Sequence, residues 1–515
     1  MKNAFRSLPA ALLVAAALSA GPAWSQARGA LPPVVQAALD KSQVPAVALA
    51  AIVIPLQRWS PKWEHRASQL MQPASTMKLV TSIVALDRLG PNHRGFTEVM
   101  TAAPLDGDVL RGDIVLRGGA DPELGLPQLW QMLTELREQG LREINGDLLL
   151  DRSFFRPARI DIGVPPFDES MEFAYNGIPD ALQLTNNLIA IEIRSDGSSV
   201  RARTLPTIDG VEFDAGAMTL SSARCADWDD DWQVPAVSDD GSMVRIALRG
   251  PFPKDCTART ELQLFDRSRL AGLTFASMWQ RLGGSWHGVV REAAAPEGAR
   301  VLVRRDARPW GELLRPLNKT SDNLLTRLLY LQIGQRAMAN DIAGNVPGNG
   351  PANTPANMKV NPSATTLERA DREVLKWFSD NRIDATGIVP DNGSGLSRSA
   401  RISPRQLAQM LVVAYQSKYA SDLLMSLPVA GVDGTMRNRL KTSPAAGWAR
   451  LKTGTLRNVA ALAGIVPDAR GRPQVLVAMI NHDHAAKARP ALDALVEWVA
   501  RGRPPAARAP GEGGP

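Results

Sequence analysis

The sequence predicts an α+β protein in which both ends of the chain build one sheet-and-helix domain around a β-rich insertion. A strand hairpin and a helix lie near the N-terminus at 46–90, and strands and a helix return near the C-terminus at 450–499. Between them, short alternating apolar runs are separated by Gly, Pro and Asp, as is typical of strands and turns. We therefore expect a discontinuous domain at 26–91 and 296–502, and an inserted region at 92–295 that comprises two nested domains.

Local patterns predict the elements of the N-terminal part. Residues 32–44 predict a short helix, and residues 46–54 a buried strand with a return strand at 59–66. A helix is expected to start at Ser75, because apolar residues from 79 to 86 keep the i, i+4, i+7 spacing of a buried face. A Gly-Pro pair then ends this helix.

The same patterns organise the rest of the chain. Strands are expected within the insertion at 113–117, 146–150, 188–194, 243–248 and 262–264. Helices are then expected at 313–338, 366–378 and 404–415, strands at 460–466 and 474–481, and a last helix at 485–499. Residues 340–361 predict an exposed loop, and residues 503–515 a disordered tail.

Composition narrows the class of protein. The chain has 515 residues, of which 44% are hydrophobic and 22% charged, as in ordinary soluble globular proteins. Its net charge is +7, and it falls to +5 when Lys2 and Arg6 are removed with the N-terminal segment. Because no run of Lys and Arg occurs, nucleic acid is not an expected partner.

The first residues resemble a secretory signal peptide at 1–25. Lys2 and Arg6 precede a short apolar stretch at 10–20, and Ala23-Trp24-Ser25 offers a small-x-small cleavage site. Cleavage is expected after Ser25, with a site after Ala27 or a retained anchor as alternatives. No later segment reaches the ~18 apolar residues of a membrane span. We therefore expect a protein exported to the periplasm, without a membrane span after cleavage.

Export makes the two cysteines informative. Cys225 and Cys256 lie 31 positions apart, and an oxidising compartment favours a disulfide between them. Closing a loop of this length stabilises the fold by about 3.7 kcal/mol in the chain-entropy model. Two buried free thiols are the alternative.

Three short motifs carry the chemistry. They are STMK at 75–78, SDN at 321–323 and KTGT at 452–455. Each alone is a common helix start, loop or turn, and the near-match KTS at 441–443 lacks the glycine. Together and in this order they are typical of serine acyl-transferases that act on D-alanyl peptides or β-lactams. Ser75 and Ser321 must then share one pocket, which requires an insertion between them.

The spacing of the first motif suits nucleophilic catalysis. A serine hydroxyl needs a base within hydrogen-bond reach, and positions i and i+3 of a helix lie on one face. Lys78 can therefore activate Ser75, provided that burial and a nearby cation lower the pKa of Lys78.

The other motifs supply the partners of this pair. Lys452 is the expected cation, and it would bind a substrate carboxylate with the hydroxyls of Thr453 and Thr455. Gly454 would leave room for the substrate backbone, and the N–H groups of Thr455 and Ser75 would form an oxyanion hole. Ser321 is expected to relay a proton, and Asn323 to hold Lys78 and the substrate amide.

Other chemistries have little support in the sequence. His482 and His484 flank one aspartate, but no third metal ligand lies nearby, so a solvated loop is the expected role. No Ser-His-Asp triad, glycine-rich phosphate loop or cysteine cluster is present. We expect neither a metal nor a cofactor.

With these motifs the chain resembles the D-alanyl-D-alanine carboxypeptidases/endopeptidases among the low-molecular-mass penicillin-binding proteins, of the type with a large insertion between the first two motifs. Further matching segments are GADPEL at 119–124, DNGSGLSR at 391–398 and LPVAGVDGT at 427–435. Asn392 departs from the usual pattern as an extra or shifted residue, and the loop at 340–361 looks specific to this chain.

The resemblance implies a β-lactamase/transpeptidase-like domain, an antiparallel sheet with helices on both faces, that carries inserted β-rich domains. It implies an acyl-enzyme on Ser75, peptidoglycan stem peptides as substrates and β-lactams as covalent inhibitors. It also implies a pocket for the side-chain amine of diaminopimelate, with Asp168 as its acid and Arg398 and Leu456 on the other side.

Two alternatives stay open. A secreted serine β-lactamase shares the motifs but lacks such an insertion between the first two of them. A non-catalytic peptidoglycan-binding protein would keep the fold without the nucleophile or base, whereas Ser75, Lys78 and Lys452 are all present here.

Overall fold

The computed structural model describes residues 30–57, 62–344 and 363–502. The expected signal peptide and tail lie outside this range, as does most of the loop expected at 340–361. The first part of that loop is helical instead, because helix α6 runs from Asn323 to Gly344.

One five-stranded antiparallel sheet joins the two ends of the chain. Its strand order is β18-β19-β20-β1-β2, and β1 pairs with β20 from Leu49 opposite Ile480 to Pro55 opposite Gln474. The return strand expected at 59–66 is the short β2. The strands of this sheet are β1 (Leu49–Pro55), β2 (Trp63–His65), β18 (Arg450–Leu456), β19 (Val459–Pro467) and β20 (Pro473–Asn481).

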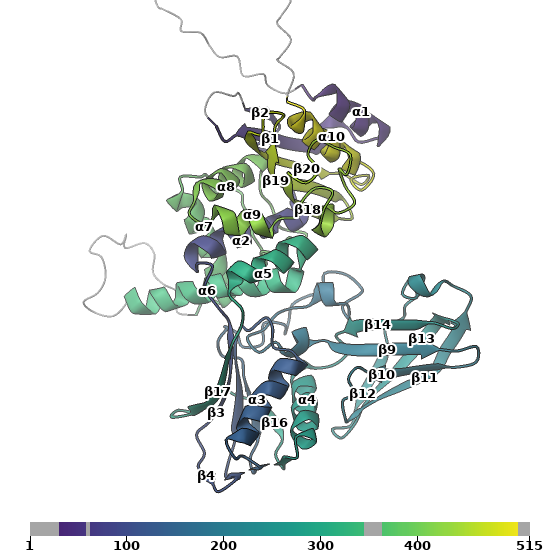
Figure 1. Cartoon of the computed structure of the whole chain (residues 1–515), viewed down its shortest axis with the longest axis vertical. Coiled ribbons are helices and arrows are strands. Elements are labelled where there is room, and N and C mark those ends of the chain that lie inside the picture. Colours follow the sequence, from purple (N-terminus) through teal and green to yellow (C-terminus); the bar gives the residue numbers. More distant parts are fainter. Residues whose placement is uncertain (1–29, 58–61, 345–362, 503–515) are drawn as a thin grey trace, which may run out of the picture.

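Both faces of this sheet are buried. In β20, Val475, Val477 and Met479 face one hydrophobic cluster, and the alternate residues Leu476 and Ile480 face another. A strand covered on both sides is apolar throughout, which explains the unbroken run that predicted it. Helices α1 (Pro33–Lys41) and α10 (Arg489–Ala500) lie on one face, and α8 (Pro404–Gln416) packs on the other (Figure 1). The predicted fold class, with helices on both faces of an antiparallel sheet, is confirmed.

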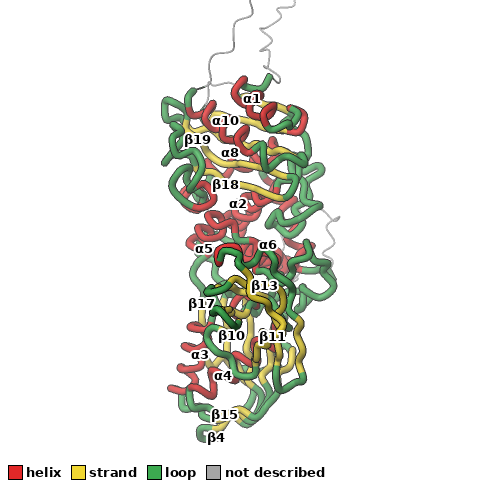
Figure 2. Tube along the Cα trace, turned by 90° about the vertical axis from the view of Figure 1, so that its right-hand side faces the viewer, coloured by secondary structure: helices red, strands yellow, loops and turns green. Residues whose placement is uncertain are grey.

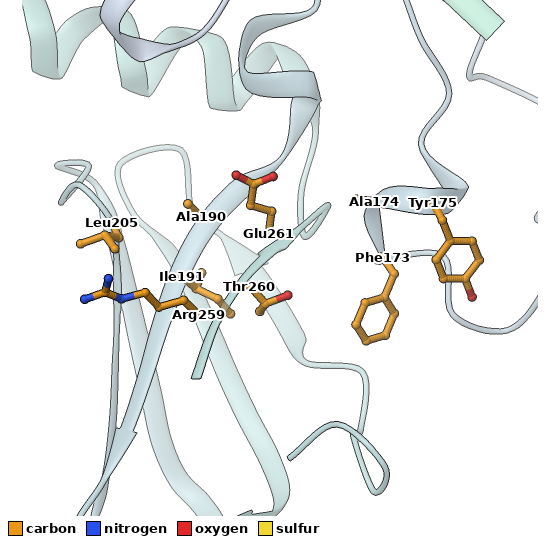
Figure 3. Close-up of a pocket in the computed structure, with 9 residues that line it drawn as sticks. All are labelled: Phe173, Ala174, Tyr175, Ala190, Ile191, Leu205, Arg259, Thr260 and Glu261. Carbon is orange, nitrogen blue, oxygen red and sulfur yellow. The ribbon is translucent and has the colours of Figure 1, made fainter. Parts of the chain in front are cut away.

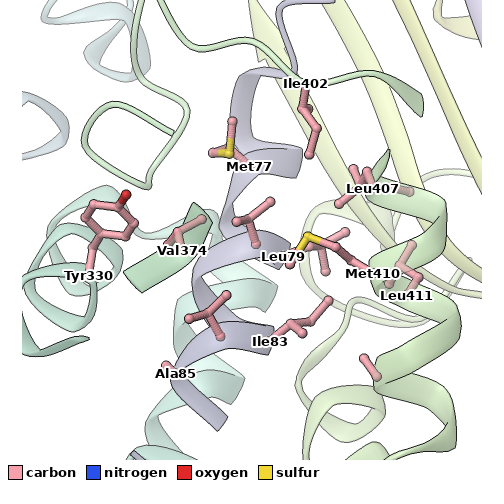
Figure 4. Packing of buried hydrophobic residues seen from close by; sticks show 14 of the residues in the cluster. Met77, Leu79, Ile83, Ala85, Tyr330, Val374, Ile402, Leu407, Met410 and Leu411 are labelled. Carbon is pink, nitrogen blue, oxygen red and sulfur yellow. The ribbon is translucent and has the colours of Figure 1, made fainter. Parts of the chain in front are cut away.

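Helix α2 (Lys78–Arg88) is the centre of the larger cluster. A single 3-10 turn, η2 (Ala74–Met77), precedes it, so the helix expected at Ser75 begins with this turn. Every residue of α2 from Lys78 to Leu86 is buried. Figure 4 shows α2 between Tyr330 and Val374 on one side and the side chains of Leu407, Met410 and Leu411 on the other. Such close packing fixes the position of whatever residues begin this helix.

Five further helices complete this part of the molecule. A capping box starts α7 at Thr365 and another starts α8 at Ser403, since each side chain accepts a hydrogen bond from the residue three positions on. These helices are α5 (Trp310–Pro316), α6, α7 (Thr366–Asp380), α8 (Pro404–Gln416) and α9 (Ala420–Ser426).

The two ends of the inserted region, at 96–151 and 267–306, form a mixed α/β unit. Two small sheets have the orders β16-β8-β6-β3-β17 and β15-β7-β5-β4, and two helices pack on them. The helices are α3 (Leu126–Glu138) and α4 (Arg267–Arg281). The strands are β3 (Phe96–Thr101), β4 (Leu105–Asp106), β5 (Val109–Leu110), β6 (Ile114–Gly119), β7 (Glu143–Ile144), β8 (Leu148–Asp151), β15 (Ser285–Trp286), β16 (Val290–Glu292) and β17 (Arg300–Asp306).

Two features of this unit differ from the prediction. The sequence analysis expected mostly strands, yet Leu129, Met132, Leu133 and Leu136 give α3 the periodicity of a buried helix face. Strand β17 pairs with β3 although it lies beyond residue 295, where the insertion was expected to end. Its short alternating run falls just before α5, so the sequence pattern did not separate it from the helical part.

The middle of the inserted region, at 189–262, is an all-β unit with its own hydrophobic cluster. Two three-stranded sheets have the orders β10-β9-β14 and β11-β13-β12. Figures 1 and 2 show both inserted units at the end of the molecule opposite the five-stranded sheet. The strands are β9 (Ile189–Ser195), β10 (Val200–Thr204), β11 (Val211–Ser221), β12 (Ala236–Asp239), β13 (Val244–Pro253) and β14 (Thr257–Leu262).

A disulfide ties this all-β unit together. Cys225 and Cys256 are bonded, with their Cα atoms 5.3 Å apart.

None of the helices within the described ranges is long and apolar enough to cross a bilayer.

We expect the double variant Cys225→Ser/Cys256→Ser to unfold at lower temperature than the wild type, because its unfolded chain is less constrained. The chain-entropy model sets an upper limit of about 3.7 kcal/mol for this loss of stability. Calorimetry of the two proteins measures it, and non-reducing peptide mapping identifies the linked pair. Two free thiols in exported protein would contradict the pairing.

Candidate active site

The first motif lies where η2 meets α2. Ser75 is half-buried in the turn, and Lys78 begins the helix. The Lys78 Nζ donates a hydrogen bond of 3.2 Å to the Ser75 Oγ, as the i, i+3 spacing predicts. The candidate base therefore reaches the candidate nucleophile directly.

The ammonium group of Lys78 has no contact with solvent. Its Nζ also donates to the Asn323 Oδ1 and to the carbonyl oxygen of Ser394, both at 2.7 Å, and the side chain is completely buried. Burial lowers the pKa of Lys78 well below its usual value, and the charges of Lys452 and Arg327 lower it further, while Asp322 opposes them. A lysine in this setting is suited to accept a proton.

Ser321 stands in an unusual backbone conformation. It ends a π-helical turn, η6 (Leu317–Ser321), and its φ of 64° lies in the left-handed region that non-glycine residues rarely adopt. The Lys452 Nζ donates to the Ser321 Oγ at 2.8 Å and to the Thr453 carbonyl at 2.9 Å. Lys452 is also completely buried, and burial lowers its pKa to about 7.

Strand β18 carries the third motif along the edge of the main sheet. A Cβ at Gly454 would lie 2.6 Å from the Pro73 carbonyl oxygen and 3.2 Å from the Ala74 Cβ. The absence of a side chain therefore lets β18 pack directly on η2. We expected Gly454 to leave room for the substrate backbone, but the structure uses that space for the contact between β18 and the turn that holds Ser75.

The other residues of β18 differ in exposure. The Thr453 Oγ1 donates to the Thr435 Oγ1 at 2.8 Å, and Thr455 is exposed at the strand edge. Leu456 ends the strand and packs against the rim of the main core. An edge strand with free backbone groups can accept an extended peptide as an added strand.

Asp168 lies in a loop that reaches the site through neighbouring residues. Its carboxylate accepts hydrogen bonds from the Tyr175 hydroxyl at 2.9 Å and from the Asn176 Nδ2 at 2.6 Å. The carbonyl of Tyr175 in turn accepts from the Asn323 Nδ2 at 3.0 Å. The Arg398 guanidinium donates to the carbonyl of Phe167, the residue beside Asp168, at 3.0 Å. The structure thus brings Asp168 and Arg398 to one rim of the site, linked to Asn323.

Five contributors to the site were not assigned a role from the sequence. The carbonyl of Ser394 and the hydroxyl of Thr435 belong to segments 391–398 and 427–435, which were recognised as family-like only. Gly395 has a φ of +76°, and a Cβ there would lie 1.9 Å from the Ala74 carbonyl oxygen, so this segment packs tightly on η2. Arg327 and Tyr175 carry no local motif that would mark them.

The histidine pair follows directly on β20. His482 and His484 lie with ring centroids 5.5 Å apart. Within the described ranges, no group of three or more His, Cys, Asp or Glu side chains is placed to hold a metal ion.

The chain is similar over most of its length to known carboxypeptidases. The D-alanyl-D-alanine carboxypeptidase of Actinomadura sp. (strain R39) is 28% identical over 502 residues, covering 93% of this chain and 86% of that protein. The D-alanyl-D-alanine carboxypeptidase DacB of Haemophilus influenzae is 25% identical over 429 residues, covering 81% of this chain and 82% of its own.

A solved structure shares the fold. The crystal structure of penicillin binding protein 4 (dacB) from Haemophilus influenzae matches with a TM-score of 0.71 and 22% identity, over 90% of this chain and 99% of that chain. The family model described as D-Ala-D-Ala carboxypeptidase 3 (S13) matches residues 33–344 and 355–502. The resemblance seen in the sequence is therefore confirmed, and the chain belongs to the D-Ala-D-Ala carboxypeptidase 3 (S13) family of peptidases.

Proposed function

We propose that this protein is a serine-type D-Ala-D-Ala carboxypeptidase and D-Ala–diaminopimelate endopeptidase that acts on peptidoglycan through an acyl-enzyme on Ser75. The observation that carries the proposal is the hydrogen-bonded group of Ser75, buried Lys78 and Asn323 beside the pair of Ser321 and Lys452. Membership in a carboxypeptidase family supports the reaction. The signal-like N-terminus supports export to the periplasm, where the substrate lies.

Acylation would begin at Ser75. Neutral Lys78 accepts the proton of the Ser75 hydroxyl as the oxygen attacks the carbonyl carbon of the penultimate D-Ala. The N–H groups of Ser75 and Thr455 hold the oxyanion. Ser321 then passes a proton toward the leaving nitrogen, water enters, and hydrolysis of the ester restores Ser75.

Substrate binding would itself prepare the base. Lys452, with a pKa of about 7, is only partly charged in the free enzyme at neutral pH. A substrate carboxylate beside Lys452, Thr453 and Thr455 favours the charged ammonium. That charge in turn disfavours a proton on Lys78, since Lys452 is one cause of the lowered pKa of Lys78. The enzyme would thus gain its neutral base when a substrate with a free carboxylate arrives.

The rim around Asp168 would select peptides that carry diaminopimelate. Asp168 is half-buried and keeps a carboxylate fixed by Tyr175 and Asn176, which suits it to bind an ammonium group. Arg398 would line the same rim beside Phe167, and Leu456 would line the side formed by β18.

The first test measures covalent attachment of penicillin to Ser75. Treatment with penicillin should add one acyl group to the wild type and none to Ser75→Ala, because the β-lactam carbonyl is attacked by this hydroxyl. Intact-mass spectrometry measures the adduct, and the melting temperature of the variant verifies its fold. A wild type that stays unmodified would refute the mechanism.

The second test addresses the base. In Lys78→Arg the guanidinium cannot give up its proton, so acylation should fall by about 10²–10⁴-fold. In the wild type the rate should rise with pH until Lys78 is neutral, and this rise should end well below the usual pKa of a lysine, because burial lowers the pKa of Lys78. Stopped-flow acylation across pH measures both effects, with Lys376→Arg on the exposed face of α7 as the control. A normal acylation rate in Lys78→Arg would show that Lys78 is not the base.

The third test compares substrates. Asp168→Ala should raise KM for a diaminopimelate peptide by about tenfold, the cost of losing one charged hydrogen bond, while a bare acyl-D-Ala-D-Ala peptide keeps its KM. Glu169→Ala removes the same charge from the same loop and should change neither value. Equal effects of Asp168→Ala on the two peptides would argue against the pocket.

Release of β-lactams should be slow, because the opened ring stays tethered over the ester and keeps water away. Steady-state hydrolysis of a chromogenic β-lactam measures this release. Several turnovers per second would place the protein among the β-lactamases instead.

A further inference from the structure

A pocket of about 600 Å³ lies between the all-β unit and a short 3-10 turn, η3 (Ala174–Asn176). Figure 3 shows Phe173 and Tyr175 on one side of it and side chains from β9 and β14 on the other. Leu205 adds an apolar side chain and Arg259 and Glu261 add charge, whereas Ile191 turns its side chain into the buried cluster of the all-β unit. A pocket of this size and mixed lining is typical of sites for part of a larger ligand.

The wall of this pocket adjoins the catalytic residues. The carbonyl of Tyr175 accepts the hydrogen bond from the Asn323 Nδ2, and Asn323 also holds Lys78. One turn further along α6, the Arg327 Nη1 donates to the Gly177 carbonyl at 2.7 Å. The η3 segment is therefore fixed to α6 at two points and separates the catalytic centre from the pocket. A ligand that extends past η3 can reach both.

The sheet that lines the pocket has a positive outer face. Strand pairing places Glu192 opposite both Arg203 and Arg259, which bind its carboxylate at 2.9 and 2.8 Å. On the next rung Arg194 stands opposite Arg201, and like charges directly opposite each other are unfavourable in a sheet. Such a face attracts carboxylates.

Of the arginines on this face, Arg259 is the one that lines the pocket. Its guanidinium keeps donors beyond those used by Glu192, because a guanidinium has five. Glu261 lies on the same face about 7 Å further along β14. Its exposed carboxylate has no hydrogen-bond or ion-pair partner among the residues that the structure describes.

We propose that this pocket binds the second stem peptide of a cross-linked peptidoglycan fragment, with a free carboxylate of that peptide on Arg259. Glu261 accepts an amide N–H of the same peptide, and the apolar walls take its alanine methyl groups. The inference rests on the proposed function, because cross-linked fragments matter only to an enzyme that cleaves them. It names a binding site separate from the rim around Asp168, which lies on the other side of Tyr175.

Binding to a protein that cannot turn over tests the site directly. The full chain with Ser75→Ala is titrated calorimetrically with two purified ligands, a cross-linked disaccharide-tetrapeptide dimer and an uncross-linked disaccharide-pentapeptide. We expect the dimer to bind about tenfold more tightly, the worth of one charge-assisted hydrogen bond. In Ser75→Ala/Arg259→Gln this advantage should disappear, and in Ser75→Ala/Glu261→Gln it should remain, since an amide oxygen still accepts.

A matched control removes the same charge outside the pocket. Ser75→Ala/Arg201→Gln loses an arginine from the same sheet face and should keep the advantage of the dimer. Equal affinities for the two ligands, an advantage that survives Arg259→Gln, or one that is lost in Arg201→Gln would each overturn the proposal. Should Arg259→Gln fail to fold, Ala190→Trp fills the pocket without touching the contacts of Glu192 and must abolish the advantage.

The outcome is separable from that of the proposed function. A wild type that takes no penicillin adduct and releases no D-Ala refutes the proposed function, whereas the binding comparison in the Ser75→Ala protein decides the pocket alone.

Discussion

Two lysine side chains buried within one site set the constraint on which the rest of this structure depends. An ammonium group removed from water is costly unless it is hydrogen-bonded, and two of them repel each other. Lys78 meets this constraint with oxygen atoms from Ser75, Asn323 and Ser394, and Lys452 meets it with Ser321 and a backbone carbonyl. These partners come from segments that lie more than a hundred positions apart in the sequence, so the pocket exists only when the whole domain around the five-stranded sheet is assembled. The lowered pKa values are the chemical result of that assembly.

Backbone geometry secures this arrangement together with the side-chain packing around α2. Gly454 and Gly395 let β18 and the segment at 391–398 approach η2 from two sides, so that the turn with Ser75 is held between them. The left-handed φ of Ser321 turns its hydroxyl toward Lys452 at the end of the π-helical η6. A larger residue at either glycine would push the nucleophile away from its base. Residues that carry no reactive group, such as these two glycines, therefore help to set the position of Ser75 relative to its base.

Much of this could be predicted from the sequence, and the failures have physical causes. The three motifs and the apolar strand β20 predicted the sheet and the lysine–serine contact, because helical spacing and strand alternation are local properties. The carbonyl of Ser394 could not be found that way, since any residue offers a carbonyl and only the fold aims it. Helix α3 was missed although its apolar period is present, because the turns around it favoured strands. Arg327 and Tyr175 act through α6 and η3, whose contact arises only in the folded molecule.

The pairing of β1 with β20 also affects the order in which the parts of the chain fold. Strand β1 cannot pair with β20 until residues near 480 have been synthesised. The sheet beside Ser75 and α2 is therefore completed only when almost the entire chain is available. Both inserted units bury hydrophobic clusters drawn from 99–303, and they need nothing from the C-terminal strands. They can fold first, as domains usually do, and so hold the two halves of the site close to each other. The insertion then shortens the search that brings Ser75 and Lys78 to Asn323 and to the pair of Ser321 and Lys452.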